Sequence, residues 1–414
     1  TALDVTVQRT ILDLLRELQI KRKMSIIFIS HDLSVIGYIA DRVLVMRDGK
    51  MVEVGDTLSI FKNPQHPYTK ALIASRPPLN KRLMCLPVLS DFLHPPQHNK
   101  DEQKSITEII SKLVISEKER KVRHEAIYSK PPLISVRNLK VYYPIKSGFF
   151  GKVRDYVKAV DDVSLDIYPG ETLGLVGESG SGKTTLGQAI IKLIDSSGQI
   201  LWKGRDVNKF SQKELREWRK NVQIIFQDPY SSLNPRITVG ETIMEPMRIH
   251  KILENDIERK ERAMELLRRV GLEESHFYRY PHEFSGGQRQ RICIAKALAS
   301  NPEFIVCDEC VSSLDVSVQA QVLNLLKELQ NEFNLTYLFI SHDFSVVKFM
   351  SDRICVMYMG KIVEIGEADH LYLNHKDEYT HKLISSILPT DIDEIEKNYI
   401  LRKRQLNQKP HETT

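Results

Sequence analysis

Long apolar runs are missing from this sequence of 414 residues. Its longest apolar stretches, such as 25–30 and 304–307, have only the length of a strand, whereas a membrane-spanning helix needs roughly 20 apolar residues. Cysteine is also scarce, and the five Cys are scattered and odd in number, which argues against a disulfide framework and for a reducing compartment. The N-terminus has no basic region followed by an apolar region and a small-residue cleavage site, so nothing indicates secretion.

A strong charge of either sign is missing as well. The formal net charge is +5, from 59 Lys and Arg against 54 Asp and Glu, so the composition demands neither a nucleic acid nor a membrane as partner. With 42% hydrophobic residues, the chain has the composition of an ordinary globular protein. Its length predicts two or three domains, because single cores usually stop growing at about 250–300 residues.

A domain-scale repeat is the first positive feature. Residues from Thr1 align without gaps, at a constant offset, with residues from Ser312, and the segment Phe-Ile-Ser-His-Asp occurs at 28–32 and again at 339–343. About two-fifths of the positions up to Ser75 are identical, which indicates a duplicated domain rather than a short solenoid repeat. We therefore expect the first copy to be the C-terminal third of a domain whose earlier part lies outside the sequence.

The segment between the copies changes character. Proline pairs at 77–78 and 95–96 break regular structure, and 101–125 is charged and helix-capable. We predict a linker with one amphipathic helix, which is either a connector or a helix that docks a partner. Its apolar stripe consists of Ile106, Ile109, Ile110 and Leu113. The predicted domains are 1–80 (C-terminal fragment of the first copy), 81–132 (linker), 133–392 (complete second copy) and 393–414 (polar tail).

Strands and helices alternate in the second copy. Strand patterns occur at 133–136, 157–159, 163–167, 172–176, 224–226, 303–307 and 337–340. Helical patterns occur at 214–219, 261–270, 287–298 and 318–333. This alternation predicts an α/β domain with a mainly parallel sheet.

A glycine-rich loop separates the strand at 172–176 from a helix that starts near Lys183. It consists of Gly177, Glu178, Ser179, Gly180, Ser181, Gly182, Lys183 and Thr184, which satisfies G-x-x-x-x-G-K-[ST]. Inward N–H groups of such a loop, with the helix N-terminus, bind phosphate oxygens. We expect Lys183 to contact the β- and γ-phosphates of a nucleotide, Thr184 to ligate Mg²⁺ and Thr185 to reach the α-phosphate. The flanking strand and helix disfavour the alternative, a glycine-rich turn that happens to precede a lysine.

Two further segments carry chemistry. The strand at 303–307 leads into Asp308, which would hold the Mg²⁺ shell, and Glu309, which would activate water as a general base. A helix opens on Ser285, Gly286, Gly287 and Gln288. This helix start is a second anion-binding site with N–H groups exposed by the glycines, or else a simple helix cap.

These motifs, in this order, resemble those of the nucleotide-binding subunits of ATP-binding-cassette (ABC) transporters. The resemblance covers nearly all of 133–390 and, as a fragment, 1–75. It implies a phosphate-loop cassette with a mixed β-sheet core and a helical subdomain, which binds ATP and Mg²⁺. It adds Gln227 as the Q-loop glutamine, Asp315 as the D-loop aspartate, His342 as the switch histidine and Tyr143, or else Tyr142, as the aromatic that stacks on adenine.

The resemblance also implies how these residues divide the work. The catalytic residues are Glu309, His342, Gln227 and Lys183, and the metal ligands are Thr184, Gln227 and Asp308. Two cassettes pack head to tail, so that ATP lies between the phosphate loop of one and the signature 285–288 of the other. The first copy keeps Asp4 and His31 but has no phosphate loop or signature of its own. We therefore expect this chain to bind ATP through 143–315 but to hydrolyse it poorly, unless second copies pair between chains.

Three segments are similar to the oligopeptide/dipeptide (and nickel) importers within this family: 227–236, 314–321 and 63–69. This similarity implies a peripheral ATPase at the cytoplasmic face of the plasma membrane. Its partners would be separate permease subunits and a solute-binding protein, with no nucleic acid. Two motifs depart from the family: Cys310 replaces a proline, and 377–379 reads Asp-Glu-Tyr instead of His-Pro-Tyr. Cys85 is the only cysteine in the region that follows the first motif, so no iron–sulfur cluster is expected.

Other interpretations remain open. Tandem-cassette ATPases without a membrane partner, such as ribosome-associated translation factors, also join two cassettes by a linker, although 227–236 argues against them. A module that only binds nucleotide for regulation is disfavoured by the presence of Glu309 and His342. Cys307 and Cys310 have the spacing of a redox or metal pair, but no second pair exists and the acids between them have other roles.

Overall fold

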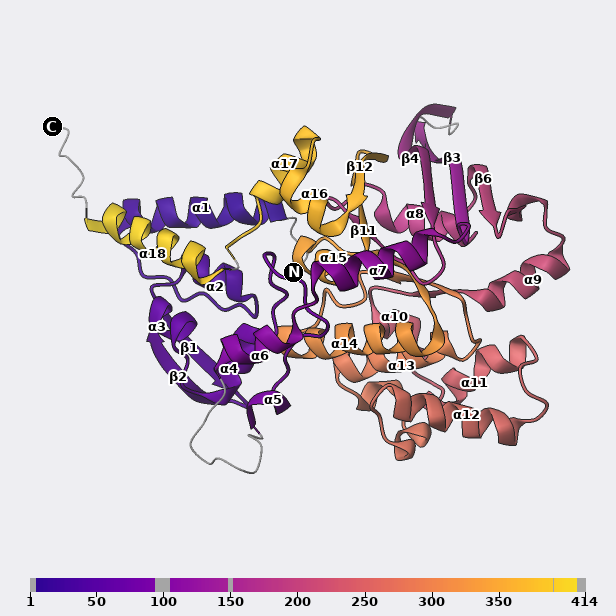
Figure 1. Cartoon of the computed structure of the whole chain (residues 1–414), viewed down its shortest axis with the longest axis horizontal. Coiled ribbons are helices and arrows are strands. Elements are labelled where there is room, and N and C mark those ends of the chain that lie inside the picture. The colour runs from indigo at the N-terminus through magenta and orange to yellow at the C-terminus, as the bar shows by residue number, and fades with distance from the viewer. Residues whose placement is uncertain (1–4, 94–104, 148–151, 390, 408–414) are drawn as a thin grey trace. The chain divides into compact units, whose positions relative to one another are not determined.

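The computed structural model describes residues 5–93, 105–147, 152–389 and 391–407. The described chain forms two compact units (Figure 1). The larger unit contains 117–147, 152–314 and 322–384, and the smaller unit contains 5–93, 105–116, 315–321, 385–389 and 391–407. Within these residues, we find no helix whose length and hydropathy would let it cross a bilayer.

A six-stranded sheet forms the centre of the larger unit. Its order is β12 (Lys361–Glu367), β11 (Arg353–Tyr358), β5 (Thr172–Val176), β10 (Thr336–Ile340), β9 (Phe304–Asp308) and β8 (Val222–Ile225). All pairs are parallel except β11 with β12, and every residue of β5, β9 and β10 is buried. Strands buried on both faces are typical of parallel sheets that are covered by helices. This confirms the predicted α/β class.

A second, antiparallel sheet completes the core of the larger unit. Its order is β4 (Lys152–Ile167), β3 (Ile134–Ser147), β6 (Ser197–Trp202) and β7 (Arg205–Asp206). Leu173 and Leu175 of β5 belong to the same hydrophobic cluster as Val136 and Val160 of this sheet, and all four are fully buried. Both sheets therefore share one core around the strand that leads into the phosphate loop.

Helices surround these sheets (Figure 1). The α-helices are α7 (Glu117–Tyr128), α8 (Lys183–Ile190), α9 (Gln212–Asn221), α10 (Pro229–Ser232), α11 (Val239–Ile249), α12 (Asp256–Arg269), α13 (Gly286–Leu298), α14 (Val316–Phe333), α15 (Phe344–Met350), α16 (Ala368–Asn374) and α17 (Glu378–Ser385). The 3₁₀ turns are Val207–Lys209, Glu274–Tyr278 and Pro281–Glu283. The first turn of α14 groups with the smaller unit.

The smaller unit contains the first copy. A hairpin of β1 (Arg42–Arg47) and β2 (Lys50–Asp56) lies among helices. These are α1 (Val5–Arg22), α2 (Leu33–Ile39), α3 (Thr57–Lys62), α4 (Pro67–Ala74), α5 (Ser90–Leu93), α6 (Ile106–Leu113) and α18 (Ile392–Asn407). Leu12, Val35, Tyr38 and Ile39 form a buried cluster with Leu388.

The segment of the first copy that aligns with β10 (Thr336–Ile340) forms no strand among the described residues. Residues 24–29 of the first copy align with the region of β10 but form no strand, and Ile27 and Ile29 are 93% and 92% exposed. Their equivalents Leu338 and Ile340 are 0% exposed, because β10 pairs with β5 on one side and β9 on the other. Among the described residues, 24–29 pair with no strand, whereas a central strand needs a neighbour on each side.

The structure differs from two sequence predictions. The described part of the linker contains three helices, α5, α6 and α7, instead of one. The predicted helical stretch is divided between α6 and α7, because Val114 bridges Leu83 and the Ile115 N–H donates to the Arg82 carbonyl. The predicted polar tail from 393 forms α18, with Ile395 and Arg402 buried. The boundaries between the predicted domains remain a proposal.

Candidate functional site

The phosphate loop connects the end of β5 to α8, as the sequence predicts. Two glycines are required by close backbone contacts: a Cβ on Gly177 would lie 2.1 Å from the Met357 carbonyl oxygen, and one on Gly182 would lie 2.0 Å from that of Ala159. Gly182 also has a φ of 104°, which side chains rarely adopt. The loop is therefore clamped between two backbone segments and can present its N–H groups in a fixed curve.

Lys183 lies buried inside this loop. Its Nζ donates hydrogen bonds of 2.8 Å to the carbonyl oxygens of Gly177 and Glu178. The buried Ser181 Oγ has no hydrogen-bond partner among the described residues, and nothing lies within 4 Å of a Cβ built on Gly180. This arrangement fits a phosphate chain. The Ser181 hydroxyl and the Lys183 ammonium supply hydrogen-bond donors to anionic oxygens, and the open side of Gly180 leaves room for them.

Thr184 and Asp308 bring the loop to the end of β9. The Thr184 Oγ1 donates to the Asp308 Oδ1 at 2.9 Å. Burial raises the pKa of Asp308, against the lowering effect of the Thr184 hydrogen bond. A hydroxyl paired with a buried carboxylate is an oxygen-rich pair of the kind that Mg²⁺ binds.

Glu309 is the centre of a three-residue cluster. Its Oε2 accepts a hydrogen bond of 2.9 Å from the Gln227 Nε2 and lies 3.2 Å from the His342 Nδ1. The hydrogen bond from His342 lowers the pKa of Glu309, and the same bond raises the pKa of His342. Glu309 has a left-handed φ of 46°, an uncommon conformation for a residue with a side chain. The sequence-predicted residues Glu309, His342 and Gln227 are therefore brought together.

The predicted signature forms the start of α13. The Ser285 side chain accepts from the Gln288 N–H at 3.3 Å, and the Gln288 side chain accepts from the Ser285 N–H at 3.0 Å. Gly286 and Gly287 occupy the first turn. This is a capping box, so the helix-cap interpretation describes the structure, and a role of 285–288 in binding a second nucleotide stays a prediction.

Several predicted residues occupy less distinctive positions. Tyr143 lies on β3 with 46% of its surface exposed, whereas the Tyr142 hydroxyl is bonded to Asp161. Because neighbouring side chains on a strand point to opposite faces, only one of the two tyrosines can lie over a base. Thr185 is half-buried in the first turn of α8. The Asp315 Oδ1 accepts from the Val318 N–H at the start of α14.

Residues from the C-terminal side of the larger unit also reach the phosphate loop, and the sequence analysis missed them. The Glu178 N–H donates to the Tyr379 hydroxyl at 3.0 Å, and Tyr379 stacks on Tyr358 with ring centroids 4.1 Å apart. The Gly360 N–H donates to the Ser181 carbonyl at 3.0 Å. The occurrence of tyrosine at equivalent positions of both copies was the available signal for Tyr379.

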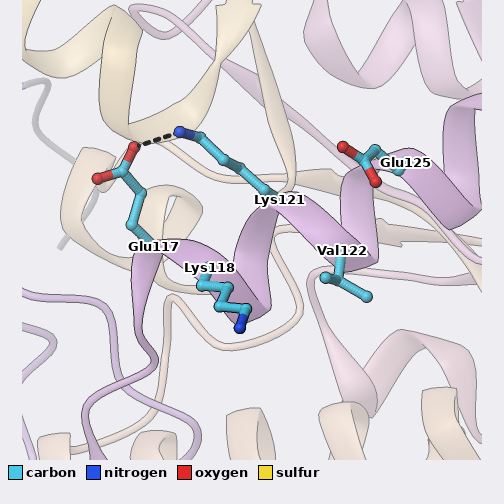
Figure 2. A pocket seen from close by; sticks show the side chains of 5 residues that line it. All are labelled: Glu117, Lys118, Lys121, Val122 and Glu125. Carbon is cyan, nitrogen blue, oxygen red and sulfur yellow. Dashed lines mark ion pairs between the residues drawn. The ribbon is translucent and has the colours of Figure 1, made fainter.

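One predicted residue and one surface hollow lie apart from this site. Asp4 of the first copy lies outside the described residues. A hollow of about 530 Å³ lies beside α7, where it is lined by residues of that helix alone (Figure 2). The lining residues are Glu117, Lys118, Lys121, Val122 and Glu125. They include none of the predicted nucleotide-binding residues.

Known protein families match both copies. The family described as "ABC transporter" matches residues 160–312, a range that contains the phosphate loop, the signature and both acids. The family described as "Oligopeptide/dipeptide transporter, C-terminal region" matches residues 52–97 of the first copy and linker.

Curated relatives match almost the whole chain. The glutathione import ATP-binding protein GsiA of Escherichia coli (strain K12) is 46% identical over 388 residues. That of Salmonella paratyphi A is 47% identical over 393 residues. Each alignment covers 94% of this chain but only 60% of the relative, so the chain spans about three fifths of the length of these proteins.

Solved structures show the same fold. The ATP-binding cassette MJ0796, described as a dimer in a post-hydrolysis state bound to ADP and Pi, has a TM-score of 0.51 and 30% identity, over 57% of this chain and 98% of its own. For cbiO1 from Clostridium perfringens, part of the ABC transporter complex cbiONQ, the TM-score is 0.52 at 25% identity, over 59% and 92%. This chain belongs to the ABC transporter family of ATP-binding proteins. Within that family, it is homologous to the glutathione import ATP-binding proteins and carries the oligopeptide/dipeptide type of C-terminal region.

Proposed function

We propose that the larger unit binds ATP with Mg²⁺ on the phosphate loop and hydrolyses it when a second cassette completes the site. The observation that carries this proposal is that Gln227 and His342 both contact the same carboxylate oxygen of Glu309. Lys183 acts electrostatically on both Glu309 and Asp308. A cation, two carboxylates and a histidine around one phosphate loop supply the parts that phosphoryl transfer to water needs.

The residues divide these tasks by position. Lys183 and the loop N–H groups would hold the phosphates, and Thr184, Asp308 and Gln227 would hold Mg²⁺, whose charge neutralises the phosphate oxygens when it is bound. Glu309 would accept the proton of the attacking water, since its lowered pKa keeps it ionised at neutral pH. Tyr143 would stack on the adenine.

A second cassette is needed to complete this site. In the proposed head-to-tail pair, 285–288 of one cassette closes over the nucleotide on the phosphate loop of the other, next to Asp315. These 414 residues contain one phosphate loop and one such signature, so a polypeptide of this sequence would need a second polypeptide to complete the site. We propose that this chain hydrolyses ATP only when the second copies of two chains pair.

The proposed cellular role is that of a peripheral ATPase that powers import of small peptides through a separate permease, with a solute-binding protein as a further partner. The match of 52–97 to the oligopeptide/dipeptide C-terminal region supports this role over a ribosome-associated ATPase. Glutathione, which appears in the names of the relatives, has the size of a tripeptide and is an example of such a solute. Phe226 and Tyr230 flank Gln227 and are 38% and 65% exposed, so this surface is available to a permease at the cytoplasmic membrane face.

Nucleotide binding can be tested on the chain as it is. We expect Mg²⁺-dependent binding of a fluorescent ATP analogue, and Lys183→Ala should weaken it at least tenfold because a charge-assisted contact is lost. Lys192→Ala is the matched control, because Lys192 bonds Asn208 outside the phosphate loop. Equal affinity in wild type and Lys183→Ala would contradict the proposal.

Hydrolysis needs a second experiment. We expect the turnover number per chain to rise with protein concentration, because pairing between chains completes the site, and Glu309→Gln should lower it by a factor of about 100 or more. A high turnover number that is independent of protein concentration would contradict the need for a second chain.

A further inference from the structure

Two aspartates at equivalent positions of the copies are each bound by a basic pair on a helix. In the larger unit, Asp352 is 3% exposed and accepts hydrogen bonds of 2.9 and 3.2 Å from the Arg123 guanidinium, with the His124 Nε2 at 3.6 Å. Burial raises the pKa of Asp352, but the nearby His124 and the charge and hydrogen bonds of Arg123 outweigh it and lower the pKa. Both basic residues belong to α7.

The same arrangement occurs in the smaller unit. Asp41, the equivalent of Asp352, lies 3.2 Å from an Nη of Arg402 and 3.7 Å from the Lys403 Nζ. Arg402 is 3% exposed, and its guanidinium also donates to the carbonyl oxygens of Tyr38 and Ala40 at the end of α2. Here the basic pair belongs to α18.

The two helices present the same kind of face. Arg120, His124 and Ile127 of α7 recur at i, i+4 and i+7, and so do Ile395, Tyr399 and Arg402 of α18, which places each set on one side of its helix. Ile127 and Ile395 are buried, at 6% and 1% exposed. The remaining side of α7 is the exposed, charged one, where Glu117 and Lys121 form an ion pair (Figure 2).

Chain order makes this arrangement reciprocal. The helix α7 follows the first copy and packs on the second within the larger unit, whereas α18 follows the second copy and packs on the first within the smaller unit. Each copy thus has a docking surface, formed by the aspartate and its neighbouring helices, for a helix that comes after the other copy in the sequence.

The two docking surfaces differ in charge at matched positions. In the larger unit, Arg120 pairs with Asp369, which also pairs with the buried Lys348. In the first copy, the position equivalent to Lys348 is Gly37. A Cβ built on Gly37 would lie only 3.1 Å from the Ile395 side chain. Leu58 replaces Asp369. If α7 docked on the first copy, Arg120 would therefore face Leu58 and lose its carboxylate partner. If α18 docked on the second copy, Ile395 would face the ammonium of Lys348.

A third position reinforces this difference. Lys62 of α3 forms an ion pair of 2.6 Å with Glu396 of α18. The equivalent of Lys62 in the second copy is Leu373. Glu396 would therefore lack its cation if α18 docked on the second copy.

We propose that the surfaces around Asp41 and Asp352 are two versions of one helix-docking site, and that their differing charges make them non-interchangeable. The site around Asp41 takes α18 of the same chain, bearing Ile395, Glu396, Arg402 and Lys403, and does not take α7. The helix α18 is thereby an element that ties the end of the second copy to the first, independently of any nucleotide.

Hydrogen exchange of the full chain, followed by mass spectrometry, tests this assignment. Gly37→Lys installs the second-copy residue in the first site, and Arg402→Met removes the guanidinium. Each should raise exchange in α18 at least tenfold and leave α7 unchanged. Asp369→Leu installs the first-copy residue in the second site. It should raise exchange in α7 and leave α18 unchanged. Ile400→Lys, on the exposed side of α18, is the control and should change neither helix.

Two exchange outcomes would overturn the proposal. Unchanged exchange in α18 for both Gly37→Lys and Arg402→Met would show that this surface does not hold the helix. Faster exchange in both helices for every variant would show a general loss of structure instead of two separate sites.

A cysteine pair tests whether the occupant comes from the same chain. In a Cys85→Ser background, Gly37→Cys with Ile395→Cys should form a disulfide on oxidation within one chain, seen as a monomer-sized band under non-reducing conditions. Gly37→Cys with Ile400→Cys is the matched control and should not. A disulfide-linked dimer, or no disulfide, would overturn docking in cis.

Discussion

The hydroxyl of Tyr379 accepts the backbone N–H of Glu178 at 3.0 Å, which joins α17 to the phosphate loop. The ring of Tyr379 is in turn stacked on Tyr358, next to the segment whose carbonyl oxygen lies closest to Gly177. The loop is therefore held from outside by the C-terminal side of the larger unit. A hydrogen bond of this kind contributes about 0.5–1.5 kcal/mol.

Tyr379→Phe removes the hydroxyl that accepts this hydrogen bond and keeps the stacked ring. We expect a two- to tenfold rise in the KM for ATP with little change in kcat, because a less well-ordered loop binds nucleotide more weakly. Tyr358→Phe is the matched control, since among the described residues its hydroxyl makes no hydrogen bond to the loop. Equal KM values for the two variants would contradict a positioning role of Tyr379.

The pair of Glu309 and His342 predicts a direction of pKa change. Glu309→Gln removes the hydrogen bond that raises the pKa of His342, and burial then lowers this pKa, so it should fall below the wild-type value. NMR titration of the histidine rings measures it, with Glu303→Gln as the control. The sign for stability follows: the pair stabilises the fold above the lowered pKa of Glu309 and is lost as pH rises through the raised pKa of His342.

Gly182 predicts a large loss of stability on adding one methyl group. Gly182→Ala would combine a left-handed φ with a contact of 2.0 Å to the Ala159 carbonyl oxygen, and we expect a cost of about 3 kcal/mol. Gly204→Ala shares the left-handed φ but meets nothing within 4 Å, and should cost only about 1 kcal/mol. Thermal unfolding of both variants would show the difference, and equal shifts would contradict the close approach.

The cysteines near Glu309 are expected to be unreactive. The hydrogen bond between Cys307 and Cys310, together with burial, raises the pKa of Cys307, and burial raises the pKa of Cys293 to about 12. Only thiolates react with iodoacetamide. Native alkylation followed by peptide mass spectrometry should therefore label the partly exposed Cys85 at least tenfold faster than Cys293 and Cys307. Cys310 should also be labelled slowly, because it is buried away from the reagent. Equally fast labelling of Cys307 or Cys310 would reopen the redox interpretation of this pair.

Local signals predicted the phosphate loop and its flanking elements well. The loop lies between a buried strand and a helix because its glycines and Lys183 are adjacent in the sequence. In contrast, the sequence predicted two separate strands at 157–159 and 163–167, where the structure has the single strand β4. Irregular pairing with β3, between Val141 and Leu139, accommodates the left-handed Asp162 without ending the strand.

Contacts between distant segments were beyond the sequence analysis. Arg402 lies in a polar, basic run, and it is buried only because Tyr38 and Ala40, more than 350 residues earlier, supply carbonyl oxygens. The cluster around Glu309 was predicted through the family resemblance instead, because Gln227, Glu309 and His342 follow three different strands. Their meeting at one edge of the sheet depends on the strand order.

Two isoleucines of the first copy, Ile27 and Ile29, form an exposed apolar surface. Both side chains face solvent, and the adjacent main chain at 24–29 is in no strand of the described structure. Exposed apolar surface beside unpaired main chain favours association with a further strand. A strand placed beside this segment, from any part of the protein or from another copy, would cover both side chains and satisfy the adjacent main chain.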